Sequence, residues 1–297
     1  MPSGTDERLR IYEVEERLQV RPFFIKHRAT DKHFYMDFHA HPGYEIYFFQ
    51  QGSGNFLIED RIFPLVGGDI LLISEYESHK SAPSMGVDCS RSVVNFLPEL
   101  LLPQAKAIFL ELFVPGQDMT HRHLRVSGDT LSRMNDLLTR MENEVRKQPE
   151  LFEVSCSICL NELLLEIYRL VHSQHSEGTS PISRSSVNPR VEQVIRYLSE
   201  RYSEPITLKQ LADMIFVSPY YLCHLFKETT GITISEYLIY TRIRQSKREL
   251  ALTEYSIAEI ASRVGFNTLA HFGQTFKMME GMTPRDYRKK LNSGNVK

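Results

Sequence analysis

The sequence predicts a two-domain protein. An N-terminal antiparallel β-barrel or jelly roll with trailing α-helices is followed by an all-α domain, in which a long helix joins two helix-turn-helix motifs. Three observations lead to this fold class. Short strand-like runs occupy residues 23–94, a Ser- and Pro-rich stretch covers residues 173–189, and one pattern occurs twice between Thr207 and Tyr287. A chain of 297 residues is long enough for two separate hydrophobic cores.

The barrel is indicated by short runs of β-branched and aromatic residues. Glycine-containing or acidic turns separate them, at Gly52-Ser-Gly54, Glu59-Asp60 and Gly67-Gly68. Short strands at this spacing are typical of an antiparallel barrel or jelly roll. Residues 1–22, before the first run, form a polar arm. The predicted strands are Phe23–Ile25, Tyr44–Phe49, Asn55–Ile58, Ile62–Phe63, Asp69–Ile73 and Val93–Val94.

Helices follow Pro98 and Pro103. The first is expected at Ala105–Phe113, and the second begins at Ser127 or Asp129. A third, from about Glu153 to His172, has more apolar positions than one core-facing stripe needs. The surplus either packs on the barrel or faces another subunit. The one-sided stripe of the second helix comprises Leu131, Met134, Leu138, Met141 and Val145.

The Ser- and Pro-rich stretch predicts a linker. The expected domains are therefore residues 1–172, the linker 173–189 and residues 190–297. Four cysteines, Cys89, Cys156, Cys159 and Cys223, suggest no disulfide framework. Cys156 and Cys159 fit a helix face as small apolar groups.

The repeat predicts one structural unit used twice. Leu208–Ser218 matches Ile257–Asn267 at an offset of 49 residues, with an alanine at the same place in each. The match continues at an offset of 50. Leu222, Phe226, Lys227, Gly231, Thr233 and Tyr237 correspond to Phe272, Phe276, Lys277, Gly281, Thr283 and Tyr287.

Each copy has the plan of a helix-turn-helix, whose second helix enters the major groove of DNA. In the first copy, Leu208–Ile215 is the short helix, Ser218 caps the second helix and Pro219 is its first residue. In the second copy, Ser256 and Glu259 form a capping box. Gly265 lies at the turn, and Asn267 is expected to cap the next helix.

One helix, Ile234–Leu252, is expected between the copies. Its 19 residues span roughly 28 Å, close to the ~34 Å of one DNA turn. It could therefore hold two recognition helices in successive major grooves. Its basic residues either reach phosphates or form a solvated face: Arg242, Arg244, Lys247 and Arg248.

Charge supports a polyanionic partner for the back half only. Arg190–Lys297 contains 16 basic and 11 acidic residues, a net charge of +5, and the remainder carries −7. No apolar run approaches the ~18 residues of a membrane span, and the N-terminus does not resemble a signal peptide. We therefore expect a cytoplasmic protein without a membrane partner.

Residues 190–290 resemble the DNA-binding domain of the AraC/XylS family of bacterial transcription regulators. The resemblance rests on Ser256–Ala261, Val264-Gly-Phe266, Phe272, Phe276-Lys277, Gly281–Pro284 and Tyr287. It implies that Tyr220, Cys223 and His224 face bases in the first recognition helix, and Thr268, Leu269, His271 and Gln274 in the second. Arg242 and Lys277 complete the predicted DNA-binding set.

Many members of this family have arginine where this chain has His224 and Gln274. Gln pairs bidentately with adenine, whereas Arg prefers guanine, so we expect fewer critical G contacts there. The two recognition surfaces also differ, which predicts two unlike half-sequences about one helical turn apart. Phe226, Phe272 and Phe276 are expected in the core.

The front half contains His39-Ala-His41-Pro-Gly-Tyr-Glu45, and His79 lies further along. These residues resemble the two cupin motifs, which implies a metal held by His39, His41, Glu45 and His79. The second motif is degraded: Ser74, Tyr76 and Pro83 replace its proline, glycine and asparagine. The resemblance to AraC-type sensor domains instead implies an effector pocket containing the same residues and Tyr47. We favour the pocket, without a cofactor, and a divalent transition metal remains the alternative.

These observations predict a ligand-responsive transcription regulator, an activator that senses a sugar or another small polar metabolite. The resemblance implies a homodimer through Glu153–His172, with Leu163 and Leu164 in the seam, and RNA polymerase is a further expected partner. The alternative is a metal-binding cupin enzyme tethered to DNA. A DNA-repair alkyl acceptor needs an activated cysteine in a basic setting, which Cys89, Cys156 and Cys159 lack. No nucleotide-binding loop or hydrolase triad is present, so we expect no enzyme.

Overall fold

A computed structural model describes residue 14 and residues 16–30, 38–84, 86–114, 122–172 and 187–294. The chain forms two compact units, Met1–Val187 and Asn188–Lys297. The boundary between them falls inside the predicted linker, of which residues 173–186 lie outside the described part. Most of the predicted N-terminal arm also lies outside it, although residues 16–20 are helical.

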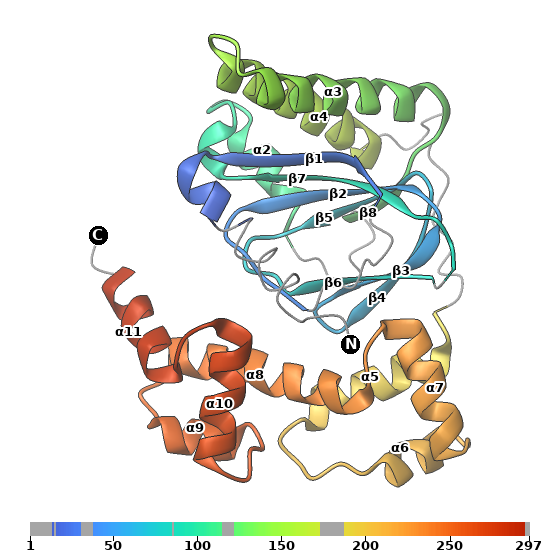
Figure 1. Ribbon diagram of the computed structural model, residues 1–297, viewed down its shortest axis with the longest axis vertical. Helices are drawn as coiled ribbons and strands as arrows, with labels where there is room; N and C mark the ends of the chain where they lie inside the picture. The colour runs from blue at the N-terminus through green and yellow to red at the C-terminus, as the bar shows by residue number, and fades with distance from the viewer. Residues whose placement is uncertain are drawn as a thin grey trace. The chain divides into compact units, whose positions relative to one another are not determined.

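The front unit contains two antiparallel sheets (Figure 1). One has the order β1-β7-β2-β5-β8 and the other β4-β3-β6. The structure confirms the six predicted strands and adds two, β6 and β8. Both additions are short and polar in sequence, so they show no strand-like apolar run. The strands are β1 (Phe23–Ala29), β2 (Tyr44–Gln51), β3 (Ser53–Ile58), β4 (Arg61–Val66), β5 (Asp69–Ile73), β6 (His79–Pro83), β7 (Ser90–Phe96) and β8 (His123–Arg125).

Successive side chains of β2 point to opposite faces of the sheet, so the strand contributes to two separate hydrophobic cores. Ile46 and Phe48 pack with the helices, whereas Tyr47 and Phe49 pack with residues of β3, β4 and β5 between the sheets. Glu45 shares the parity of Tyr47 and is likewise buried. The strand therefore places a carboxylate and a phenol on the inner side of the barrel.

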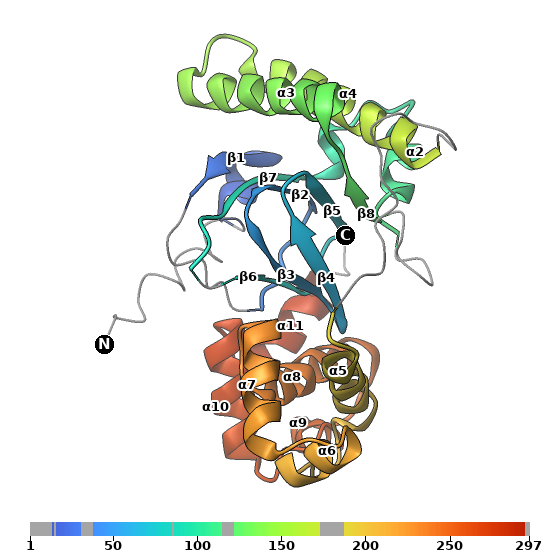
Figure 2. The same ribbon diagram turned by 90° about the vertical axis from the view of Figure 1, so that its right-hand side faces the viewer.

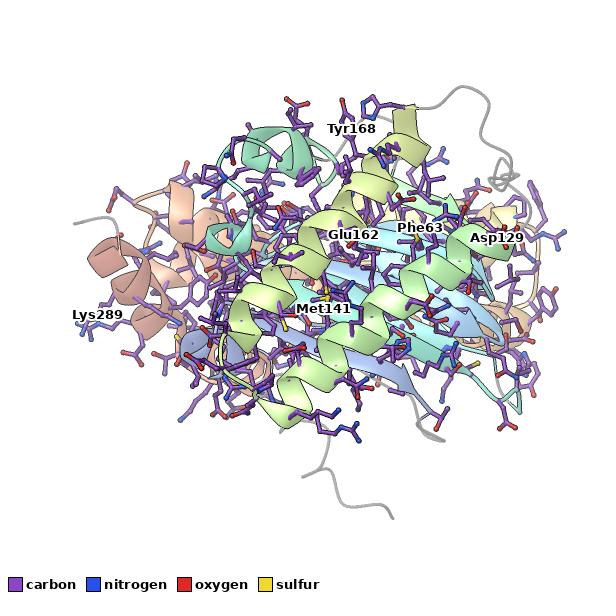
Figure 3. The ribbon with its side chains drawn as sticks, turned by 90° about the horizontal axis from the view of Figure 1, so that it is seen from above. Phe63, Asp129, Met141, Glu162, Tyr168 and Lys289 are labelled. Carbon is purple, nitrogen blue, oxygen red and sulfur yellow. The ribbon has the colours of Figure 1, made fainter. Side chains whose placement is uncertain are left out.

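Three helices and a 3-10 turn cover the larger sheet: η1 (Pro98–Leu100), α2 (Lys106–Glu111), α3 (Gly128–Lys147) and α4 (Phe152–His172). Figure 3 shows α3 and α4 side by side, with Met141 and Glu162 labelled on them. The predicted stripe of α3 faces the core, since Met134, Leu138 and Met141 are buried. Cys156 and Cys159 are also buried, and burial raises the pKa of the Cys156 thiol to about 12. They are packing residues, as expected.

The back unit is all helical: α5 (Pro189–Arg201), α6 (Leu208–Met214), α7 (Pro219–Thr230), α8 (Ile234–Leu252), α9 (Ile257–Arg263), α10 (Leu269–Glu280) and α11 (Pro284–Gly294). α6 and α7 lie toward one end of α8, and α9, α10 and α11 toward the other (Figures 1 and 2). The bounds of α8 are those predicted from the sequence. No helix among the described residues combines the length and apolar character needed to cross a membrane.

Capping side chains define where these helices begin. Ser218 accepts a hydrogen bond from the Tyr221 amide with Pro219 at the first turn, and Ser256 and Glu259 form the predicted capping box. The prediction that Asn267 caps α10 is wrong. Thr268 is the cap, and its hydroxyl accepts a hydrogen bond from the His271 amide. The extra residue that shifts the repeat offset from 49 to 50 therefore lies before the cap.

Candidate functional site

α7 and α10 are the second helices of the two helix-turn-helix units, and each has one buried side. Leu222 and Phe226 anchor α7, and Phe272 and Phe276 anchor α10, so the three phenylalanines are core residues, as predicted. The predicted base-facing residues all lie on the exposed sides: Tyr220, Cys223, His224, Thr268, Leu269, His271 and Gln274. Lys277 is exposed as well. Both helices therefore present the predicted base-facing side chains to solvent.

Besides Thr268, whose hydroxyl caps α10, two of these side chains contact protein groups. The ring of His271 packs edge-on against Phe266, with ring centroids 5.3 Å apart. The His224 imidazole lies 3.8 Å from the Glu228 carboxylate, an exposed pair one helical turn apart. Such an exposed pair is weak, so it leaves the His224 imidazole available to another partner.

The basic residues of α8 are divided between structural and exposed positions. Arg242 donates from Nε to the carbonyl oxygen of Tyr202 (2.7 Å) and from a terminal nitrogen to that of Glu204 (3.1 Å). Lys247 forms an ion pair of 2.8 Å with Glu280. Arg248 is exposed. Arg242 thus ties α8 to the end of α5, a role that the sequence pattern did not indicate.

In the barrel, the structure brings together all four residues of the cupin-like motif. His39 and His79 form an isolated β-bridge, and their ring centroids lie 4.1 Å apart. Nε2 of His41 lies 3.0 Å from Oε2 of Glu45, and Nε2 of His79 lies 3.6 Å from the same oxygen. All four side chains are buried, with at most 8% of each residue exposed. We call His39, His41, Glu45 and His79 the histidine cluster.

Charges within the cluster oppose the effect of burial. Burial alone would raise the pKa of Glu45, but the charge of His79 and the hydrogen bond from His41 hold that pKa well below its usual range. Burial alone would lower the pKa of His79, but the charge of Glu45 raises it above its ordinary value. The cluster therefore favours an ionised Glu45 carboxylate beside His79.

Asn95 is a fifth member of this site, which the predicted site residues did not include. It lies opposite Glu45 in the β2–β7 register, and its amide nitrogen donates to Oε2 of Glu45 at 2.8 Å. The same nitrogen lies 3.2 Å from Nε2 of His41. The available signal was a polar residue after Val93 and Val94 in a buried strand.

A clamped loop positions His79. Arg122 is completely buried and binds both carboxylate oxygens of Glu77, and its Nε donates to the carbonyl oxygen of Leu72 at 2.8 Å. The Glu77 carbonyl oxygen in turn accepts from Nδ1 of His79 at 2.8 Å. Tyr76, which replaces the cupin glycine, has φ +56°, a conformation that favours glycine. No local sequence pattern indicates this contact, because Arg122 lies 45 residues beyond Glu77.

Tyr47 lies beside the cluster and lines a small pocket with Phe49, Ser81, Pro83, Cys89, Ser90 and Arg91. Its hydroxyl is 3.3 Å from that of Ser81, and burial raises the pKa of Tyr47 to about 12. The phenol therefore stays neutral at physiological pH and can donate or accept a hydrogen bond.

Comparison with known proteins places both halves of the chain. Residues 211–290 match the model of a helix-turn-helix domain, and residues 22–153 match that of an AraC-like ligand binding domain. The chain is 25% identical over 253 residues to the Msm operon regulatory protein of Streptococcus mutans, covering 84% of this chain and 85% of that protein. It is also 25% identical over 256 residues to the transcriptional activator RhaR of Yersinia pestis, covering 85% and 84% of the two chains.

Among solved structures, the C-terminal domain of AraT, a response regulator from Geobacillus stearothermophilus, is 35% identical to the matched part. It covers 36% of this chain and 88% of that chain, with a TM-score of 0.34. The two family models together span the barrel and the helix-turn-helix repeat, in the order that the structure shows. The chain therefore belongs to the AraC family of transcription regulators, with an N-terminal ligand-binding domain and a C-terminal domain that binds DNA.

Proposed function

We propose that this regulator activates transcription as a homodimer when a small polar molecule binds in its barrel. The observation that carries the proposal is the pairing of two features in one chain. Two recognition helices present exposed polar faces, and a separate barrel encloses a polar cluster among aromatic side chains. Binding sites for small molecules commonly combine apolar walls with a few such polar groups.

The DNA-contacting part of the proposal uses the predicted residues of α7 and α10. The +5 charge of Arg190–Lys297 attracts DNA without sequence preference, and the exposed side chains supply sequence discrimination. Because α8 joins two unlike recognition helices, the operator half-site should be asymmetric, with two different sequences about one helical turn apart.

Selection of operator DNA tests this part. Full-length protein should enrich one motif from a random duplex pool, and the motif should contain two unlike elements. Enrichment of a tandem repeat of one element would contradict the asymmetric arrangement. Binding should weaken as salt rises, because lysine and arginine contacts to phosphate release counterions.

The dimer seam proposed here differs from the sequence prediction. Leu163 and Leu164 are fully buried against the barrel and α3, so they belong to the core of the unit. The exposed apolar residues of α4 are instead Val154, Ile158 and Leu165. We propose that this exposed stripe contacts the second subunit.

Charge substitution on α4 separates the two roles. Ile158→Glu in the full chain should yield monomers with an unchanged circular dichroism spectrum, measured beside sedimentation velocity. Leu164→Glu should instead unfold the front unit, because it buries an unpaired charge. A dimer that survives both Ile158→Glu and Val154→Glu would contradict this seam.

For the effector, we propose a polar metabolite such as a sugar, held by the histidine cluster and Tyr47. A thermal-shift screen of the full chain against metabolites tests it, and a binder should alter affinity for the selected operator. Tyr47→Phe should lower the affinity for such a metabolite, while the affinity for operator DNA measured without the metabolite should not change.

We further propose that the chain acts in the cytoplasm and contacts RNA polymerase. Its relatives are named as regulators, and turnover of a small substrate would be needed to favour the enzyme alternative.

A further inference from the structure

The two helix-turn-helix units touch each other outside the helix that joins them. Tyr202, at the end of α5, packs against the hydrophobic core of the second unit. A Cβ atom on Gly265 would lie 3.0 Å from the α-carbon of Ser203, so the turn between α9 and α10 lies directly against the connection between α5 and α6. The recognition helices are therefore linked by this contact as well as by α8.

Arg242 of α8 holds this contact together. Its Nε donates to the carbonyl oxygen of Tyr202 at 2.7 Å, and a terminal nitrogen donates to that of Glu204 at 3.1 Å. The same Nε is among the atoms nearest to a Cβ atom placed on Gly265. One guanidinium thus joins α8 to the α5–α6 connection and lies against the turn of the second unit, a task that suits a planar group with several fixed donors.

A contact of this kind restrains the bending of α8. If α8 were the sole link, small changes in its curvature would alter the distance and the angle between α7 and α10. With Arg242 in place, such bending has to pull the turn of the second unit away from the α5–α6 connection. That connection leads into the capping box of Thr207 and Gln210, where α6 begins, and α6 packs on α7. The position of α7 is therefore tied to that of α10.

We propose that Arg242 is a positioning residue that sets the spacing between operator elements which this regulator accepts. It holds α7 and α10 at one separation and one relative rotation, and it replaces the DNA contact that the family resemblance implied for it. One base pair inserted between two elements separates them by about 3.4 Å and rotates them by about 35°. A braced pair of helices does not follow that change, whereas a pair joined by α8 alone follows part of it. The inference rests on the proposed operator with two elements.

The test compares affinities of the full chain for the selected operator and for versions with one base pair added or removed between the elements. We call the ratio of these affinities the spacing penalty. The wild type should show a penalty of about tenfold or more, because one element is then misaligned. Arg242→Met keeps an apolar stem but loses both hydrogen bonds, and its penalty should fall to about threefold or less, because α8 alone can bend. Arg248→Met removes a charge from an exposed position of the same helix and should keep the wild-type penalty.

Arg242→Lys separates positioning from charge. Lysine keeps a positive charge for phosphate, but one ammonium group does not reproduce the fixed donors that reach Tyr202 and Glu204 together. Its spacing penalty should therefore fall toward that of Arg242→Met. Circular dichroism checks the fold of each variant, and Arg242→Lys, the milder change, decides the question if Arg242→Met does not fold. A wild-type penalty in Arg242→Lys would overturn the inference, because charge alone would then explain the role of this residue.

The outcomes also separate this inference from the operator on which it rests. Selection of an operator with one element would overturn both. A two-element operator with equal spacing penalties in the wild type and Arg242→Met would overturn this inference alone, even if Arg242→Met bound every version more weakly. Such a uniform loss is what a purely structural or electrostatic role of Arg242 predicts.

Discussion

The two helix-turn-helix units repeat one another down to single hydrogen bonds. Capping boxes begin both short helices, Thr207 with Gln210 in α6 and Ser256 with Glu259 in α9. Both recognition helices end at a left-handed glycine whose amide donates to a lysine carbonyl oxygen. Each unit also has an edge-to-face aromatic pair, Phe226–Tyr237 at 5.8 Å and Phe276–Tyr287 at 5.5 Å.

The units differ at the turn. Gly265 has φ +91°, and a Cβ atom there would lie 2.9 Å from the Ser203 carbonyl oxygen and 3.0 Å from Nε of Arg242. Phe216 occupies the matching position with φ +57°, and 91% of the residue is exposed. The second turn is therefore packed against the α5–α6 connection, to which Arg242 also donates hydrogen bonds, whereas the first turn projects away from the domain. Two units with the same local sequence pattern thus differ in how their turns pack against the rest of the domain.

The largest effect should come from Gly265→Ala. Left-handed strain and the close contact with Ser203 should lower the local opening free energy of residues 257–280 by about 2–3 kcal/mol. Phe216→Gly, the matched change, should alter the stability of residues 208–230 by less than about 1 kcal/mol, because relief of strain and added chain entropy oppose each other. Hydrogen exchange by mass spectrometry on the full chain measures both. Equal losses at the two turns would refute the distinction.

The second-largest effect, on operator affinity, tests which half of the operator each recognition helix contacts. Gln274→Ala should cost about 1–3 kcal/mol of discrimination at one base pair of the element bound by α10, roughly ten- to a hundredfold in affinity. His224→Ala, at the matched position in α7, should reduce base discrimination only in the other operator element. Binding to every single-base operator variant measures both. If Gln274→Ala left all relative affinities unchanged, its assignment to base contact would be wrong.

A smaller effect tests the corrected cap of α10. Thr268→Ala should destabilise residues 268–280 by about 1 kcal/mol, because the His271 amide loses its acceptor. Asn267→Ala should be nearly neutral, since Thr268 already provides that hydrogen bond. Hydrogen exchange of the first turn of α10 distinguishes the two, and a larger loss for Asn267→Ala would restore the original prediction.

Much of this architecture follows from local sequence signals. The repeat, the bounds of α8 and six strands come from periodicity and capping residues, whose effects extend over a few positions. Asn95, Arg122 and Arg242 could not be found that way, because their partners lie 38 to 54 residues away in the chain. Leu163 and Leu164 illustrate a different limit. The sequence shows that they are apolar, but only the packing of α4 shows that they face the core and not a second subunit.

The smallest effect concerns Gly273, in the middle of α10, where the first unit has Cys223. A Cβ atom at Gly273 would meet no other atom within 4 Å, so packing does not require glycine there. Glycine inside a helix costs about 0.5–1 kcal/mol relative to alanine, and close approach of the backbone to a ligand is one reason to keep it. Gly273 lies beside Gln274 and near His271, which are both exposed. We therefore expect the backbone of α10 to approach DNA more closely than that of α7.

Gly273→Ala should consequently separate stability from binding. It should slow hydrogen exchange in α10 by the equivalent of about 0.5–1 kcal/mol while weakening operator binding several-fold. Cys223→Ala is the matched control, and it should change neither property appreciably, because a side chain is already accommodated there. Unchanged operator affinity in Gly273→Ala would show that both helices lie at similar depth, and the difference between the units would then be confined to their turns and side chains.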